Sequence, residues 1–189
     1  ASIGGPQAVK RFLAGLPEDT GVRFLLVQHI GVNFVELLAE QLERSTSFRV
    51  LCAKQGSELL RNQVLVTPAD QYITFNTNGS IKLRRHDKAQ IYNPCIDDVL
   101  REVAKSLPGA NAIIYSGMGD DGAQGVVKIA EAGGKVWGLE EDSCIVSSMP
   151  DSARKNGVVS FSGTPEQMAK QFVQTIKAPQ QARQKRGVK

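Results

Sequence analysis

The stretch NAIIYSGMGDDG, residues 111–122, decides the fold class. Its first six residues form a short apolar run that is typical of a buried strand, and Gly-Met-Gly-Asp-Asp-Gly then forms a glycine-rich loop. Residues 123–132 place apolar side chains at helical spacing, and Gly133-Gly134 ends that helix. Strand, tight loop and helix in this order are typical of βαβ units, so the stretch predicts a mostly parallel α/β sheet.

The same alternation continues on both sides of this stretch. Apolar spacing predicts helices over residues 6–16, 34–42 and 97–106 and strands over 22–28, 64–67 and 135–139. Thr164 and Gln167 are spaced as a capping box for a last helix, which we expect to end near Lys177. Two β-rich runs, 72–75 and 81–83, flank Asn78-Gly79 and predict an antiparallel hairpin. The fold class is therefore α/β, with a doubly wound, mostly parallel sheet, helices on both faces and one hairpin.

The net charge of +4 comes from the end of the chain. Residues 177–189 hold five of the 23 basic residues and no acidic ones, which leaves 18 basic residues against 19 acidic ones, a net charge of −1. We therefore expect a catalytic domain over 1–176, a basic flexible tail over 177–189, and no nucleic-acid partner. Attraction of the tail to acidic receptor or membrane surfaces is a weaker alternative.

Composition narrows the class of protein further. The sequence has no apolar run near the roughly 20 residues that span a bilayer and no signal peptide, so we expect a cytoplasmic protein without membrane insertion. Three cysteines without a C-x-x-C pair and two histidines, His29 and His86, make a metal site improbable, and no cofactor is expected. The first residues resemble a turn after a strand, so we expect a trimmed chain that lacks an upstream strand or domain.

Three polar residues are predicted to meet at the carboxyl ends of the strands. Ser2 precedes the first helix, His29 follows a strand, and Asp121 lies in the glycine loop; such positions converge at one edge of a parallel sheet. A serine nucleophile needs an imidazole to take its proton, and the imidazole needs a carboxylate on its other nitrogen. Gly4 and Gly5 would free backbone N–H groups for an oxyanion. From spacing alone, a turn serine, a structural histidine and a helix-capping aspartate remain alternatives.

Several segments, taken together, resemble the CheB methylesterases of bacterial chemosensing. Ala1-Ser2-Ile3-Gly4-Gly5 is similar to the Ala-Ser-Thr-Gly-Gly that opens that catalytic domain, and Gln28-His29-Ile30 to its Gln-His-Met segment. The most specific match is Ser116-Gly117-Met118-Gly119-Asp120-Asp121-Gly122, which is similar to the family's Thr-Gly-Met-Gly-Asn-Asp-Gly loop. Further matches are Val66-Thr67-Pro68-Ala69-Asp70, residues 142–146 and Met149-Pro150, so the resemblance extends from Ala1 to about Ile176.

The resemblance implies a cytoplasmic enzyme that hydrolyses glutamyl methyl esters on the signalling domains of chemoreceptors and, in some members, deamidates glutamine. It implies Ser2 as the nucleophile, His29 as the general base and Asp121 as the partner of His29. By position, the backbone N–H of Met118 is an oxyanion donor, and Ile3 lies beside the same site. Family members usually carry an N-terminal receiver domain, to which nothing in this sequence corresponds.

Three departures from the family pattern indicate a divergent member. Ile3 replaces a threonine, Asp120 replaces an asparagine, and Asn93-Pro94-Cys95 stands where the family usually has Arg-Pro-Ser. These changes keep open the alternative of a catalytically silent domain that docks on receptor helices. A nucleotide-binding module is a further alternative, although the sequence has neither G-x-G-x-x-G nor a P-loop motif.

Overall fold

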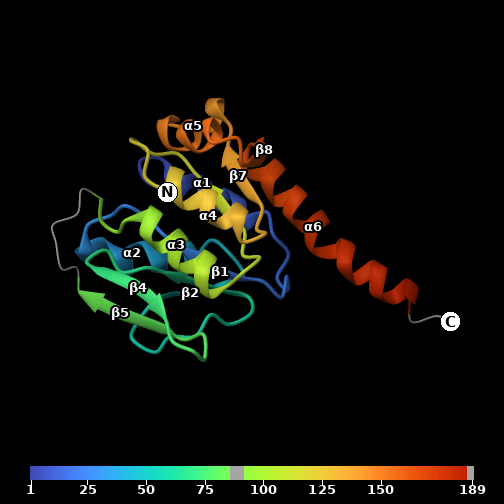
Figure 1. Ribbon diagram of the computed structural model, residues 1–189, viewed down its shortest axis with the longest axis horizontal. Helices are drawn as coiled ribbons and strands as arrows, with labels where there is room; N and C mark the ends of the chain where they lie inside the picture. Colours follow the sequence, from blue (N-terminus) through green and yellow to red (C-terminus); the bar gives the residue numbers. More distant parts are fainter. Residues whose placement is uncertain (86–91, 187–189) are drawn as a thin grey trace.

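The computed structural model describes residues 1–85 and 92–186, with side chains up to residue 176. Helices and strands alternate along most of the chain (Figure 1). The helices are α1 (Gly5–Ala14), α2 (Val35–Glu43), α3 (Ile96–Ser106), α4 (Ala123–Glu131), α5 (Ser148–Lys155) and α6 (Pro165–Arg186). The strands are β1 (Arg23–Leu26), β2 (Arg49–Cys52), β3 (Gln63–Val66), β4 (Gln71–Phe75), β5 (Ile81–Arg85), β6 (Ala112–Ile114), β7 (Val136–Leu139) and β8 (Val159–Gly163).

Two parallel, three-stranded sheets form the centre of the fold. Their strand orders are β1-β3-β2 and β6-β7-β8. The first two residues of the chain bridge them: the carbonyl of Ala1 accepts the His29 N–H at 2.9 Å, and the Ser2 N–H donates to the Ser116 carbonyl at 2.9 Å. The two sheets therefore meet beside the carboxyl ends of β1 and β6, where the predicted site residues lie.

Helices pack on both faces of these sheets, because alternate side chains of each strand point to opposite sides. On one face, α1, α2 and α6 pack against side chains that include Val64 and Leu139; on the other, α3, α4 and α5 pack against Ala112, Ile114 and Val136. The hairpin of β4 and β5 packs beside Leu65 of β3. The predicted doubly wound α/β architecture is confirmed.

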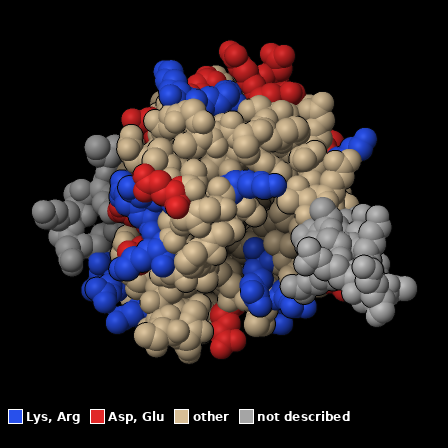
Figure 2. All heavy atoms as spheres, turned by 45° about the vertical axis from the view of Figure 1, so that its right-hand side comes forward, with Lys and Arg blue, Asp and Glu red and all other residues tan. Residues whose placement is uncertain are grey.

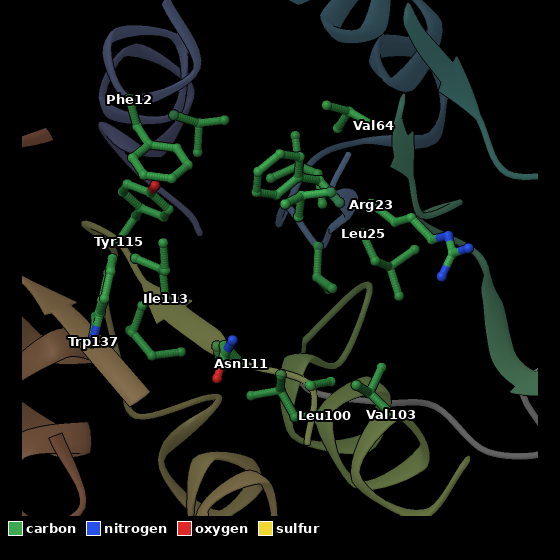
Figure 3. Close-up of a pocket in the computed structure, with 18 of the residues that line it drawn as sticks. Phe12, Arg23, Leu25, Val64, Leu100, Val103, Asn111, Ile113, Tyr115 and Trp137 are labelled. Atoms are coloured by element: carbon green, nitrogen blue, oxygen red, sulfur yellow. The ribbon is translucent and has the colours of Figure 1, made fainter. Parts of the chain in front are cut away.

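An apolar cavity of about 370 Å³ separates β1 from β6 (Figure 3). Leu25 and Ile113 approach it from the two strands, while Phe12, Tyr115 and Trp137 close one side. Both strands stand at an edge of their sheet, and neither pairs with the other in the described part of the chain. Since Ser2, His29 and Asp121 do not line this cavity, it is not the catalytic pocket.

The structure confirms two local predictions about turns and caps. β4 and β5 pair antiparallel around Asn78-Gly79. At the start of α6 the Gln167 N–H donates to Thr164 Oγ1 at 3.1 Å, and the Thr164 N–H donates to Gln167 Oε1 at 2.9 Å. These are the reciprocal bonds of a capping box.

Other elements differ from the prediction. β2, α5 and β8 were not predicted; the apolar pattern of α5 is interrupted by Pro150, and β8 alternates its few apolar residues with serines. The backbone of α6 continues to Arg186, beyond the predicted end at Lys177 (Figure 1).

Among the described helices, none is long and apolar enough to cross a bilayer. Figure 2 shows acidic and basic side chains around a largely uncharged area on one face of the molecule.

Candidate active site

His29 and Asp121 form a buried pair at the carboxyl ends of β1 and β6. His29 follows β1, Asp121 lies in the loop between β6 and α4, and His29 Nε2 lies 2.7 Å from Asp121 Oδ2. Their side chains are 13% and 1% exposed. The structure therefore brings together two residues that are 92 positions apart in the sequence.

The carboxylate of Asp121 also caps the start of α3. Its Oδ2 accepts the Ile96 N–H at 2.7 Å, its Oδ1 accepts the Asp97 N–H at 2.9 Å, and the Cys95 thiol donates to Oδ1 at 3.6 Å. Burial alone would raise the pKa of Asp121, but the hydrogen bonds from His29, Ile96 and Asp97 outweigh it, and the pKa lies below its usual value. Asp121 is thus ionised at neutral pH and caps α3 rather than α4, the helix that follows it.

The ionised carboxylate determines how the imidazole of His29 can act. A carboxylate accepts hydrogen bonds, so Nε2 carries the proton that it donates to Asp121. Nδ1 then keeps its lone pair and is the nitrogen that can take a proton from a nucleophile. Burial raises the pKa of the Cys95 thiol to about 12, so this neighbour stays protonated and remains a donor to Asp121.

Ser2 lies beside this pair and is held by its backbone. A Cβ atom on Gly117 would lie 2.7 Å from the Cβ of Ser2 and 2.0 Å from Met149 Sδ, so the loop can approach the serine this closely only with glycine at 117. Ser2 is half-buried. Within the described residues its hydroxyl makes no hydrogen bond, so the structure shows the His29–Asp121 contact but no bond from Ser2 to His29.

Two buried side chains that the sequence reasoning did not assign hold the site together. The Gln28 amide donates to the carbonyls of Ser2 at 3.0 Å and of His29 at 3.1 Å. The Ser116 hydroxyl donates to the Ile3 carbonyl at 2.6 Å and accepts the N–H groups of residues 145 and 146. Gln28 directly precedes His29, and Ser116 directly precedes the glycine loop. These positions in the quoted motifs were the one sequence signal that could have identified them.

The predicted oxyanion residues differ in what their N–H groups do. The N–H of Gly5 is buried and donates to the Ser2 carbonyl at 2.9 Å, so this residue closes the turn and has no donor left for an oxyanion. The N–H groups of Ile3, Gly4 and Met118 have no acceptor among the described residues. These three N–H groups therefore remain as candidate donors, two on the loop that holds Ser2 and one on the loop between β6 and α4.

Apolar side chains surround the entrance to the site. Ile3, Met118 and Ile145 are 49%, 60% and 70% exposed, and Ile145 packs against Gly4. Asp120 is exposed, whereas Asp121 is buried. No group of three or more metal-ligating side chains is gathered in the described part of the chain. The arrangement favours acyl-transfer chemistry on an uncharged group such as an ester.

Comparison with known proteins gives consistent results. Residues 1–172 match the model of the CheB methylesterase family. The chain is 37% identical over 164 residues to protein-glutamate methylesterase/protein-glutamine glutaminase 2 of Shewanella sp. strain MR-4, covering 84% of this chain and 46% of that protein. It is 32% identical over 160 residues to the corresponding enzyme 1 of Saccharophagus degradans, covering 84% and 44%. The chain thus spans less than half the length of these curated relatives.

A solved structure covers nearly the same part of the chain. The crystal structure of the Thermotoga maritima CheB methylesterase catalytic domain superposes with a TM-score of 0.86 at 26% sequence identity. The match covers 92% of this chain and 94% of that domain.

Proposed function

The chain belongs to the CheB methylesterase family, and we propose that it hydrolyses glutamyl methyl esters on the signalling domains of chemoreceptors, with Ser2, His29 and Asp121 as the catalytic residues. The observation that carries the proposal is the buried His29–Asp121 contact of 2.7 Å beside Ser2. A neutral imidazole held by an ionised carboxylate next to a serine is what nucleophilic ester hydrolysis requires.

In the acylation step Ser2 Oγ attacks the ester carbonyl while His29 Nδ1 takes its proton. The imidazolium that forms is stabilised by Asp121, whose lowered pKa keeps it ionised. The N–H groups of Ile3 and Met118 stabilise the negative charge on the carbonyl oxygen. Collapse of this intermediate breaks the bond to the methoxy group, His29 returns the proton to it, and methanol leaves.

In the second step water attacks the acyl-enzyme. His29 takes a proton from the water, Ser2 leaves with that proton, and the product is a glutamate carboxylate. Glutamine in place of the ester would release ammonia by the same sequence of steps. We place the reaction in the cytoplasm, with receptor helices as the partner.

A catalytically silent docking domain is the second candidate. It is favoured by one observation: the Ser2 hydroxyl has no hydrogen bond to His29 in the described residues. In apo enzymes such bonds are often loose and form only with substrate, so this observation does not outweigh the buried pair.

The test is methanol release from a methylated receptor signalling domain. Ser2→Ala should lower the rate by about 10⁴-fold or more. The matched control is Ser160→Ala, which removes a serine hydroxyl on β8 that donates to the Val136 carbonyl, outside the site, and should leave the rate unchanged. Full activity in Ser2→Ala would mean that another nucleophile acts. No release by the folded wild-type domain, together with no labelling of Ser2 by a serine-directed probe, would favour the silent domain.

A further inference from the structure

We propose that Tyr92 is a positioning residue for His29 and acts through the general base rather than on the substrate. The proposal rests on the esterase function above. The rings of Tyr92 and His29 are stacked, with centroids 5.1 Å apart and an angle of 7° between their planes. Tyr92 thus covers one face of the imidazole, whereas Asp121 contacts its edge at Nε2.

The imidazole needs this second contact because one hydrogen bond does not define its orientation. Rotation of the ring about the line from Cβ to Nε2 would preserve the bond to Asp121 while changing the direction in which Nδ1 points. A flat ring against the face of the imidazole opposes this rotation, as the two planes must stay nearly parallel. The two contacts together hold Nδ1 in one direction.

Tyr92 is itself confined by the glycine loop, and its segment leads into α3. A Cβ atom on Gly119 would lie 2.5 Å from the hydroxyl oxygen of Tyr92, so the tyrosine lies directly over this glycine. Gly119 has a φ of +88°, which also favours glycine. Further along the chain, the N–H groups of Ile96 and Asp97 bind Asp121. The segment from Tyr92 to Asp97 therefore orients both the base and its carboxylate.

Stacking also affects the charge that develops during the reaction. His29 becomes a cation when it takes the proton from Ser2. The face of a phenol ring carries partial negative charge and attracts a cation placed over it. Tyr92 should thus stabilise the protonated base in the transition state in addition to orienting the neutral base before it.

Two substitutions test which property of Tyr92 supports catalysis: its aromatic face, its hydroxyl or its size. Tyr92→Phe keeps the stacked ring and should retain kcat within about three-fold. Tyr92→Leu fills much of the same space without an aromatic face and should lower kcat by about ten-fold, with KM changed less than about two-fold. Tyr72→Leu, which removes a half-buried tyrosine on β4, is the control and should leave both constants near the wild-type values. A raised KM at unchanged kcat in Tyr92→Leu, or an equal loss in Tyr92→Phe, would overturn the positioning role.

A spectroscopic readout tests the stack without relying on turnover. The chain has two histidines, so a His86→Gln background leaves the ring protons of His29 as the sole imidazole signals in a proton NMR spectrum. The stacked tyrosine should shift these signals upfield, and Tyr92→Leu should move them downfield while Tyr92→Phe does not. Unchanged signals in Tyr92→Leu would refute the stack. If the signals move as expected but wild-type protein releases no methanol, the esterase proposal fails and the stack stands.

Discussion

Two regions along the boundary between the two parallel sheets are stabilised in opposite ways. At the carboxyl ends of β1 and β6, Asp121, Gln28 and Ser116 hold the loops with hydrogen bonds between residues far apart in sequence. Between the bodies of the same two strands lies an apolar cavity, and neither strand has a hydrogen-bonded partner at that edge in the described residues. The site end is specified by polar contacts, whereas the cavity is lined mainly by apolar side chains.

The contrast shows which contacts in this fold require exact geometry. Hydrogen bonds have narrow geometry, and each buried donor or acceptor that loses its partner costs about 1–3 kcal/mol. Apolar packing is less directional and tolerates changes that conserve volume. Substitutions at the polar end should therefore lower both catalysis and stability, while changes at the cavity should act mainly on stability.

Among the changes that compare the two regions, Asp121→Asn should have the largest effect. The amide cannot stabilise an imidazolium as a carboxylate does, and it can favour the wrong tautomer of His29 by presenting an NH₂ group to Nε2. We expect kcat for methanol release to fall by about 10³–10⁴-fold, somewhat less than in Ser2→Ala.

Asp120→Asn is the matched control for this change. Asp120 is the exposed neighbour of Asp121 and contacts none of the groups that hold it in the described residues, so kcat should stay within a few-fold of wild type. Similar losses in the two variants would mean that net charge near the loop, rather than the His29–Asp121 contact, supports the rate.

Filling the cavity should have an intermediate effect, a rise in thermal stability. Five apolar, β-branched residues fused before Ala1 would extend between β1 and β6 and pair with both edges, because Ala1 already bonds to Val27 and His29 after β1 and Ser2 bonds to Ser116 after β6. Burial of the added apolar side chains should outweigh the entropic cost of ordering the added residues and raise the free energy of unfolding by a few kcal/mol. The Tm should therefore rise by roughly 5–10 °C.

A Gly/Ser extension of the same length is the control and should leave Tm nearly unchanged. Trp137 lines the cavity and is the single tryptophan of the chain, so its fluorescence reports whether the extension enters. Equal Tm values for the two extensions, or unchanged Trp137 emission, would contradict the view that these edges accept a strand.

The sequence predicted the elements with strong local signals. Asn78-Gly79 specified the hairpin and Thr164 with Gln167 the cap of α6, since these signals act within a few residues. The glycine loop and the ends of the predicted strands also placed His29 and Asp121 at one edge, because parallel strands end on the same side of a sheet.

The remaining features depend on contacts that no local pattern encodes. The stack of Tyr92 on His29 joins residues 63 positions apart, and the cap of α3 comes from Asp121, which follows that helix in the sequence. Gly5 was predicted as an oxyanion residue because glycine frees a backbone N–H, but the turn uses that N–H itself. Such assignments require the tertiary structure.

The smallest effect is expected on the free energy of unfolding at acid pH, where the polar end should weaken and the surroundings of the cavity should not. The pKa of Asp121 in the folded protein lies below its ordinary value of 3.8, so its contribution to stability is fully present above that value and is lost as the pH falls through the folded pKa. The free energy of unfolding should therefore differ between wild type and Asp121→Asn by a constant amount near pH 7, and the difference should shrink as the pH falls below 3.8 and through the folded pKa. Amide exchange, corrected for its intrinsic pH dependence, should show Ile96 and Asp97 losing protection in wild type over this range while Leu25 and Ile113, beside the apolar cavity, do not. A difference in unfolding free energy that stays constant as the pH falls well below 3.8 would show that the bonds to α3 and His29 do not depend on the charge of Asp121.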